Sequence, residues 1–244
     1  MRASSAIHGP GRLSIGPTNL GEMPTPGAFY FDLASPLAYF AAERVLQVFS
    51  GSSVTLEWQP VLACELAAAQ TFDAFRCQQE YDVFRGELAR RAEQLGLQPL
   101  RWPDPFPFDS ALSMRVATYA KSIGRAVPFA QAAFRQAFAG GRSLADPDNV
   151  LIAAAACEMH PAAVLRGAEL RSVAEQLAAA TEAAGAAGVT DVPAVVIGGT
   201  QAGDLGRAFT GDRCLEEAAE HMRAAIAHDG AASARPGATG APAR

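Results

Sequence analysis

The sequence predicts an α/β fold in which a small core of strands and helices is interrupted by a long, wholly helical insertion. Three observations lead to this fold class. The ordered part opens with a strand, a helix and a strand, the middle of the chain has helical periodicity, and two strands and a helix follow before residue 228. With 244 residues, of which 50% are hydrophobic and 18% charged, the chain can bury a sizeable core.

The opening strand, helix and strand have clear local signals. The run FYFDL at 29–33 is short and aromatic, as in a buried strand. Ser35 is a good N-cap and Pro36 suits the first helical position, and the helical pattern that follows ends at Gly51. From 54 to 59 apolar and polar residues alternate, as in a strand with one buried face. We expect a right-handed βαβ unit.

The remaining elements follow from periodicity and from breaks at proline and glycine. The middle of the chain predicts helices over 73–96, 110–123, 127–139, 147–158 and 168–186. The end of the chain predicts a strand at 194–197, a turn at Gly198-Gly199, a strand near 200–209 and a helix over 212–227.

These elements divide the chain into a core, an insertion and two tails. Residues 1–27 and 229–244 are rich in small residues and proline without hydrophobic periodicity, so we expect both to be disordered. The core domain is expected from 28–72 together with 190–228, and the helical insertion from 73–189.

Composition excludes several classes of function. The formal net charge of −5 gives no broad cationic surface for nucleic acid or anionic membrane. There is no membrane-spanning run and no signal peptide, so we expect a cytoplasmic protein. The four cysteines include no CxxC pair, and the histidines lack metal-ligand spacing, so we expect reduced thiols and no metal.

Four motifs resemble those of a known family. The segments FYFDLASP (29–36), FPFD (106–109), GVTDVP (188–193) and FTGDR (209–213) are similar to those of kappa-class glutathione transferases and 2-hydroxychromene-2-carboxylate isomerases. This branch belongs to the DsbA superfamily, so the resemblance implies a thioredoxin-like fold with a large all-helical insertion. It covers about 28–228 and is most specific at the two ends.

Ser35 is the candidate catalytic residue. Thioredoxin folds place their reactive group at the N-terminus of the first helix, where unpaired N–H groups and the helix dipole favour an anion. Redox relatives carry a cysteine there, but a serine hydroxyl cannot form a disulfide. The resemblance implies that Ser35 donates a hydrogen bond to the thiolate of glutathione or another low-molecular-weight thiol. The alternative is that Ser35 only caps the helix.

The resemblance also implies residues that bind this cofactor. Pro193 corresponds to the cis-proline of thioredoxin folds, and Val192 before it would pair through its backbone with the ligand. The family motif near the last helix has an aspartate that meets the γ-glutamyl amine. Asp212 fills that position if one residue is deleted, whereas an ungapped match places Arg213 there. Asp212 is also a candidate N-cap.

One departure from the family bears on the identity of the thiol. Relatives often carry a lysine in the first helix of the insertion that contacts the thiol cofactor. Here Glu80 falls near that position, with Arg76 and Arg85 as candidate substitutes. The departure leaves room for a thiol other than glutathione.

Other residues are candidates for the substrate cleft. Trp102 and Phe106 belong to an apolar segment that lines a cleft or forms a packed connection, and Asp109 follows it. For Arg115 we expect one of two roles: it forms an ion pair within the protein, or it binds a carboxylate of the substrate. We therefore expect an isomerase or transferase for a small electrophilic, aromatic substrate. The sequence does not decide whether the protein is a monomer or a homodimer. The rivals are a dithiol oxidoreductase, disfavoured by the missing CxxC, and a non-catalytic binding module of the same fold.

Overall fold

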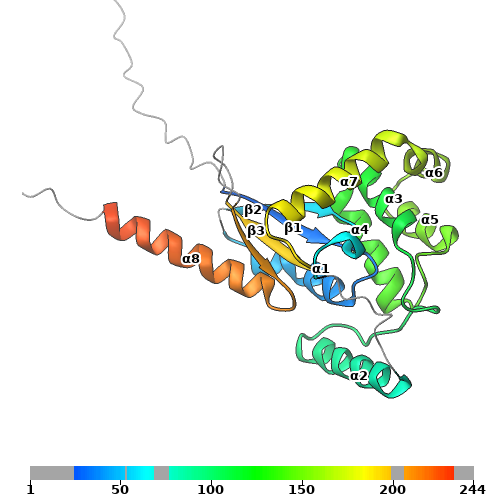
Figure 1. The fold of residues 1–244 in the computed structure, drawn as a ribbon, viewed down its shortest axis with the longest axis horizontal. Helices are drawn as coiled ribbons and strands as arrows, with labels where there is room; N and C mark the ends of the chain where they lie inside the picture. The colour runs from blue at the N-terminus through cyan, green and yellow to red at the C-terminus, as the bar shows by residue number, and fades with distance from the viewer. Residues whose placement is uncertain (1–24, 53, 69–76, 199–205, 234–244) are drawn as a thin grey trace, which may run out of the picture.

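The centre of the molecule is a mixed sheet that joins the two ends of the core domain (Figure 1). The computed structural model describes residues 25–52, 54–68, 77–198 and 206–233. Within them, four strands lie in the order β2-β1-β3-β4. β1 pairs in parallel with β2 and antiparallel with β3, which pairs antiparallel with β4. The strands are β1 (Thr25–Phe31), β2 (Val54–Pro60), β3 (Ala194–Ile197) and β4 (Arg207–Thr210).

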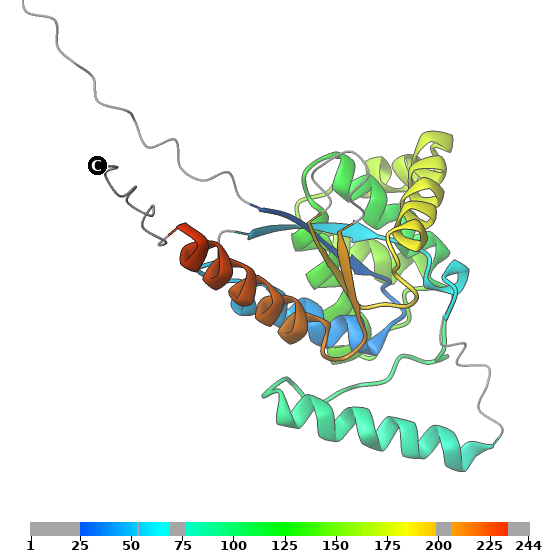
Figure 2. The same ribbon diagram turned by 60° about the vertical axis from the view of Figure 1, so that its left-hand side comes forward.

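Helices cover both faces of the sheet and fill the interval between β2 and β3 (Figures 1 and 2). α1 and α8 contact one another, and α8 also packs against β3 and β4, whereas α3 and α7 contact β2. Helix α2 lies at the edge of the molecule, away from the sheet. The helices are α1 (Pro36–Val48), α2 (Gln78–Gln94), α3 (Ala111–Ser122), α4 (Ala126–Phe134), α5 (Pro147–Ala155), α6 (Pro161–Glu169), α7 (Arg171–Ala186) and α8 (Cys214–Ser233), with a 3-10 turn, η1 (Ala63–Glu65), and a π-helical turn, η3 (Arg135–Ala139).

Alternation along the strands divides the core between the two faces of the sheet. Phe29 and Val195 enter a large cluster that includes residues of α1, α4 and α8. Their neighbours Ala194 and Val196 enter a smaller cluster with Ala184 of α7. Because consecutive side chains of a strand point to opposite faces, β1 and β3 hold both helical layers in place.

Both ends of the core domain extend further than the sequence predicts. The expected N-terminal tail, 1–27, includes three residues that belong to β1, because Thr25, Pro26 and Gly27 continue the parallel register with β2. Pairing with a neighbouring strand thus overrides the weak strand propensity of proline and glycine. At the other end, α8 continues through Ser233 into the expected tail 229–244.

Within the insertion, the sequence prediction misses one helix. The prediction of a single helix over 168–186 misses α6, because Pro161 was interpreted only as a break. Pro161 is instead the first residue of α6, and His160 caps it by accepting from the N–H of Ala162. The helix predicted over 73–96 is described as Gln78–Gln94, with 73–76 outside the described residues. Of the strand expected near 200–209, the structure describes β4 (Arg207–Thr210), because residues 199–205 lie outside the described residues.

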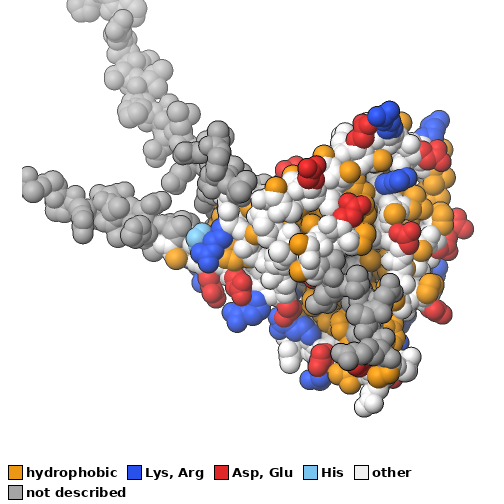
Figure 3. All heavy atoms as spheres, viewed as in Figure 1, with side chains coloured by type: hydrophobic (Ala, Val, Ile, Leu, Met, Phe, Trp, Pro, Cys, Tyr) orange, Lys and Arg blue, Asp and Glu red, His pale blue; other side chains and the backbone are white. Residues whose placement is uncertain are grey.

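The surface mixes charges of both signs. On the face seen in Figure 3, arginine side chains alternate with acidic ones rather than forming one cationic area. Among the described helices, none is long and apolar enough to cross a bilayer.

The contact of α6 with α3 leads to a testable prediction. A Cβ added to Gly167 would lie 2.5 Å from ring atoms of Tyr119, whereas nothing lies within 4 Å of a Cβ at Gly185 in α7. Overpacking costs about 1–3 kcal/mol, and helix propensity favours alanine over glycine by about 1 kcal/mol. Gly185→Ala should therefore raise the free energy of unfolding measured in urea. The free energy of unfolding of Gly167→Ala should be about 1–3 kcal/mol lower than that of Gly185→Ala. Equal stabilisation by both substitutions would show that α6 and α3 do not pack as described.

Candidate functional site

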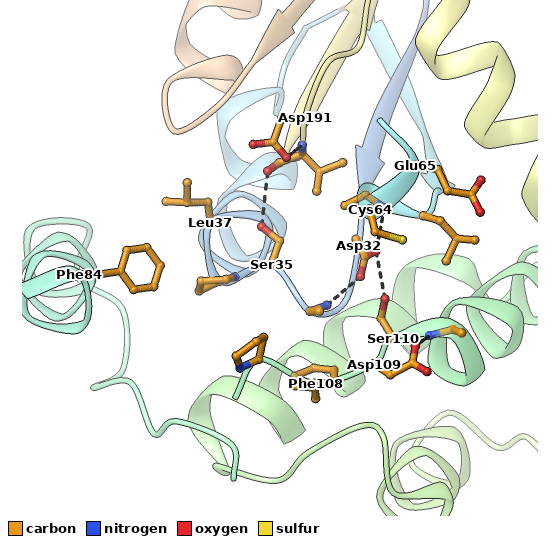
Figure 4. Close-up of a pocket in the computed structure, with 17 residues that line it drawn as sticks. Asp32, Ser35, Leu37, Cys64, Glu65, Phe84, Phe108, Asp109, Ser110 and Asp191 are labelled. Carbon is orange, nitrogen blue, oxygen red and sulfur yellow. Dashed lines mark hydrogen bonds between the residues drawn. The ribbon is translucent and has the colours of Figure 1, made fainter. Parts of the chain in front are cut away.

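A cavity of about 550 Å³ opens where β1 ends and α1 begins. Figure 4 shows it bounded by the β1–α1 turn, η1, the segment before α3, α2 and the segment before β3. The wall is mostly apolar, with a few polar groups that come from different elements. The lining residues are Asp32, Ala34, Ser35, Pro36, Leu37, Leu62, Ala63, Cys64, Glu65, Phe84, Pro107, Phe108, Asp109, Ser110, Ala111, Asp191 and Val192.

Ser35 lies at the N-terminus of α1 and lines this cavity. Its backbone is extended, with φ −90° and ψ 116°, and its Oγ accepts from the N–H of Ala38 at 3.2 Å, the geometry of an N-cap. The hydroxyl also donates to the carbonyl of Val192 at 3.5 Å. That distance exceeds the usual 2.5–3.0 Å of O–H···O bonds by about 0.5 Å, so the contact is weak. The hydroxyl is thus positioned by the helix while its proton is held loosely.

The segment opposite Ser35 contains Val192 and Pro193, and the peptide bond between them is cis. The N–H of Val192 donates to Oδ1 of Asp191 at 2.7 Å, and its carbonyl accepts from Ser35. Val192 lines the cavity, whereas Pro193 is buried behind it and accepts from the N–H of Gly211 through its carbonyl. A ligand that accepts from the Val192 N–H must therefore displace the Asp191 carboxylate, whereas one that donates to the Val192 carbonyl replaces the Ser35 hydroxyl or shares the carbonyl with it.

Asp32 joins three of the segments that surround the cavity. Its side chain is only 2% exposed and accepts from the N–H of Ala34 at 2.9 Å, the N–H of Ala63 at 3.0 Å and the hydroxyl of Ser110 at 3.1 Å. Burial raises the pKa of this carboxyl, and the three hydrogen bonds oppose that rise. Asp32 thereby ties the β1–α1 turn to η1 and to the start of α3.

Cys64 is the cysteine that lines the cavity. The residue is exposed to solvent, but its thiol is partly buried. This partial burial and, after it, the charges of Asp32 and Glu65 raise the pKa of the thiol. Cys157 and Cys214 are buried, and burial raises the pKa of Cys214 to about 12. None of these thiols occupies the start of α1, where Ser35 stands.

The substrate-cleft candidates separate into two groups. Asp109 lines the cavity, and its carboxylate accepts from the N–H of Ala111 at 2.8 Å at the start of α3. Trp102 and Phe106 do not line it: their rings pack edge to face with centroids 4.8 Å apart, and both also contact Phe138. These two residues form the packed connection that was the alternative to a cleft.

Arg115 and Asp212 also lie outside the cavity lining. Arg115 is exposed on α3. Asp212 forms an ion pair with Arg91 of α2, with 3.1 Å from Nε to Oδ1 and 2.9 Å from Nη2 to Oδ2. This two-bond pair links α2 to the segment before α8. The alternative of Asp212 as the N-cap is not seen, because α8 begins at Cys214.

Glu80, near the position of the family's lysine, and the candidate substitute Arg85 do not line the cavity. Glu80 lines a separate, shallow pocket on α2. The guanidinium of Arg85 stacks over the rings of Tyr81 and Trp102, at 5.4 and 5.0 Å from their centroids. Arg76 lies outside the described residues.

Several lining residues were not singled out by the sequence, among them Asp32, Cys64, Phe84 and Asp191. The sequence does contain a signal for Asp32, because a carboxylate that directly follows a buried aromatic strand needs hydrogen-bond partners in the folded protein. The others come from segments that meet only in the folded chain. Among the described residues, no group of three or more His, Cys, Asp or Glu is arranged to hold a metal ion.

With this geometry, the comparisons with known proteins identify the family. Residues 28–223 match the model of the DSBA-like thioredoxin domain. The chain belongs to the DSBA-like thioredoxin domain family. Its fold is thioredoxin-like, with a large helical insertion between β2 and β3. No curated protein sequence matches the chain.

Solved structures share the fold over 84–90% of the chain. A 2-hydroxychromene-2-carboxylate isomerase is 18% identical with a TM-score of 0.67, over 86% of this chain and 100% of that one. A probable DsbA oxidoreductase from Streptomyces coelicolor is 18% identical with a TM-score of 0.67, over 90% and 94%. The cytosolic disulfide reductase DsbM from Pseudomonas aeruginosa is 13% identical with a TM-score of 0.55, over 84% and 98%. The structural neighbours thus include both an isomerase and redox proteins.

The buried carboxyl of Asp32 predicts a pH dependence of stability. Because its pKa is raised in the folded state, the folded protein holds the proton more tightly than the unfolded chain. This stabilisation is fully present below the unfolded-state pKa of about 4 and is lost as the pH rises through the folded-state pKa. We expect the unfolding free energy of wild type, relative to Asp32→Asn, to fall as the pH is raised from 4. Urea titrations at a series of pH values measure it, and a difference that grows with pH would contradict the assignment.

Proposed function

We propose that this DSBA-like protein is an isomerase or transferase that depends on a low-molecular-weight thiol such as glutathione and acts on a small electrophilic, aromatic substrate in the cytoplasm. The observation that carries the proposal is the position of Ser35. A hydroxyl stands at the start of α1, inside the cavity, where redox thioredoxin folds carry a cysteine. The resemblance to 2-hydroxychromene-2-carboxylate isomerase, in motifs and in fold, supports the same class.

The described residues fit a small thiol at this position. The helix N-terminus favours negative charge within its first turn, and the hydroxyl of Ser35 has a proton to donate. Val192 faces it across the cavity and offers backbone groups for an extended ligand. The cavity volume of about 550 Å³ lies within the range of small-molecule sites, roughly 300–1,000 Å³.

The residues of the protein bind the thiol, orient it and favour its ionised form. A bound thiol supplies the nucleophile, which adds reversibly to a conjugated carbonyl and leaves after bond rotation, with no net redox change. Ser35 shifts its hydrogen bond from the Val192 carbonyl to the ligand sulfur and stabilises the charged form. Apolar side chains such as Leu37, Phe84 and Phe108 exclude water and contact the body of the substrate.

Two other functions remain rivals. A thiol–disulfide oxidoreductase is favoured by the DsbA-like structural neighbours, but it needs a reactive cysteine at the position of Ser35. A non-catalytic module that binds a thiol or peptide would use the same cavity without ionising a ligand. Thiolate absorbance of the bound ligand separates the enzyme from this module.

Removal of the Ser35 hydroxyl tests the proposal. A hydrogen bond to a charged group is worth about 1.5–3 kcal/mol, so Ser35→Ala should raise the pKa of a bound thiol by roughly one to two units. Turnover at neutral pH should fall by about one to two orders of magnitude. Ionisation of bound glutathione is followed by thiolate absorbance against pH in both proteins. Superimposable curves would leave Ser35 as a helix cap alone.

A matched variant separates ionisation from capping. Asp146 is the N-cap of α5, accepts from the N–H of Asp148 and does not line the cavity. Asp146→Ala should cost about 1 kcal/mol of stability, as Ser35→Ala does, and leave thiol ionisation unchanged. Ser35→Cys is the companion variant, which we expect to gain some thiol chemistry without isomerisation.

The redox rival leads to a separate prediction. We expect the wild-type protein to show no insulin reduction with dithiothreitol above the uncatalysed rate, because the start of α1 holds a serine and no two cysteines form a CxxC pair. Turnover comparable to that of a thioredoxin, lost on substitution of one of the four cysteines, would favour the oxidoreductase instead.

A further inference from the structure

Helix α2 contributes a single aromatic side chain to the cavity. Of the residues Gln78–Gln94, all of which the structure describes, Phe84 is the one that lines it. Figure 4 shows the ring of Phe84 projecting from α2 toward the start of α1, where Ser35 and Leu37 lie. The other aromatic lining residue, Phe108, is buried, whereas Phe84 is only partly buried. Phe84 therefore has more ring surface within reach of a ligand.

A second aromatic residue supports Phe84 from outside the cavity lining. The ring of Trp102 lies with its centroid 6.0 Å from that of Phe84, and the two planes are tilted by 54°. The guanidinium of Arg85 stacks over Trp102 in turn. Aromatic pairs prefer tilted or offset arrangements at such distances, and they gain energy beyond the burial of apolar area. An aromatic ring in the cavity can therefore make a contact with Phe84 that a saturated ring of similar size cannot.

The face of α2 that carries Phe84 is the face turned toward the rest of the protein. Leu88 and Ala92, four and eight residues further on, are the buried residues of this helix. The neighbouring residues Val83 and Arg90 fall outside this stripe and are exposed. The helical period thus separates the two sides of α2 and directs Phe84 inward.

Polar contacts hold α2 on both sides of Phe84. About one turn before it, the hydroxyl of Tyr81 donates to the carbonyl of Phe106 at 3.3 Å. About two turns after it, the guanidinium of Arg91 makes its two-bond ion pair with Asp212, which precedes α8. Because Arg91 lies seven residues after Phe84, the ion pair acts on the same side of the helix.

We propose that α2 is the substrate-recognition helix of the cavity, in which Phe84 selects aromatic over saturated rings and the ion pair of Arg91 with Asp212 positions it. The inference rests on the function proposed above and names the residue that recognises the ring of its substrate. Phe84 is thus a specificity-determining residue, and Arg91 and Asp212 are positioning residues.

Two ketones that differ in their ring test the role of Phe84. 4-Phenyl-2-butanone and 4-cyclohexyl-2-butanone lack the conjugated double bond to which a thiol adds, so both bind without reacting. Calorimetric titration of the full chain gives their dissociation constants, and we expect the phenyl ketone to bind about two- to tenfold more tightly. Phe84→Leu keeps an apolar side chain and should lower this ratio to about one. Val83→Ala, at the exposed neighbour outside the cavity lining, is the control and should leave the ratio unchanged.

Substitution of Arg91 tests the positioning role. Arg91→Gln should weaken binding of the phenyl ketone by about two- to fivefold, as expected for loss of a partly exposed ion pair, and should bring the ratio toward one. Arg91→Lys keeps the charge and should recover part of the preference. Added salt should lower the ratio in wild type, because it screens the pair, but not in Arg91→Gln. Arg90→Gln, at the exposed neighbouring arginine, is the matched control and should behave as wild type.

Titration with 2-mercaptoethanol in the same proteins distinguishes this inference from the proposed function. If the thiol does not bind while the ketones show the expected ratios, the thiol-dependent function fails and the assignment of Phe84 stands. If the thiol binds but the ketones do not, or bind equally well to wild type, the inference is wrong and the thiol site stands. A preference that survives Phe84→Leu also overturns it. A ratio that is unchanged in Arg91→Gln overturns the positioning role.

Discussion

The chemistry of the candidate site depends on the hydroxyl of Ser35, which lies between the first turn of α1 and the segment before β3. Its oxygen accepts from the N–H of Ala38, and its proton goes to the carbonyl of Val192, 157 residues away in sequence. The first bond is local and fixes where the oxygen stands. The second is long and readily exchanged for a ligand, so the same group is both anchored and available.

A second junction, at Asp32, holds the walls around this hydroxyl. The carboxyl lies at the end of β1 and draws together the β1–α1 turn, η1 and the start of α3 through three donors. Burying a carboxyl is costly unless hydrogen bonds compensate it. The cavity thus combines a carboxyl held by three hydrogen bonds with a mostly apolar wall, which is the combination expected of a small-molecule site.

The sequence predicts the sheet and the position of Ser35 well, because both depend on local patterns. Alternation along β2, the Ser35-Pro36 helix start and the buried run of β3 are each visible within a few residues. One error, the missed α6, comes from a local signal, because Pro161 begins that helix and does not break one; another arises where a tertiary contact decides. Pairing with β2 extends β1 through Pro26 and Gly27, and no local pattern announces it.

The same distinction applies to the site. Ser35 and Val192 were predicted through motifs, and the structure places both at the cavity, together with Asp109. Trp102 and Phe106 were predicted equally as cleft or as packed connection, and the structure packs their partly buried rings against one another and against Phe138. The place of Cys64, Phe84 and Asp191 in the wall was not predictable from local patterns, because their segments meet only in the folded chain.

The most direct test of the account is a crystal structure of the protein with bound 2-mercaptoethanol. The account predicts that the ligand sulfur lies within hydrogen-bond distance of Ser35 Oγ at the start of α1, and that the hydroxyl has left the Val192 carbonyl. A thiol bound elsewhere, with the bond between Ser35 and Val192 intact, would contradict it.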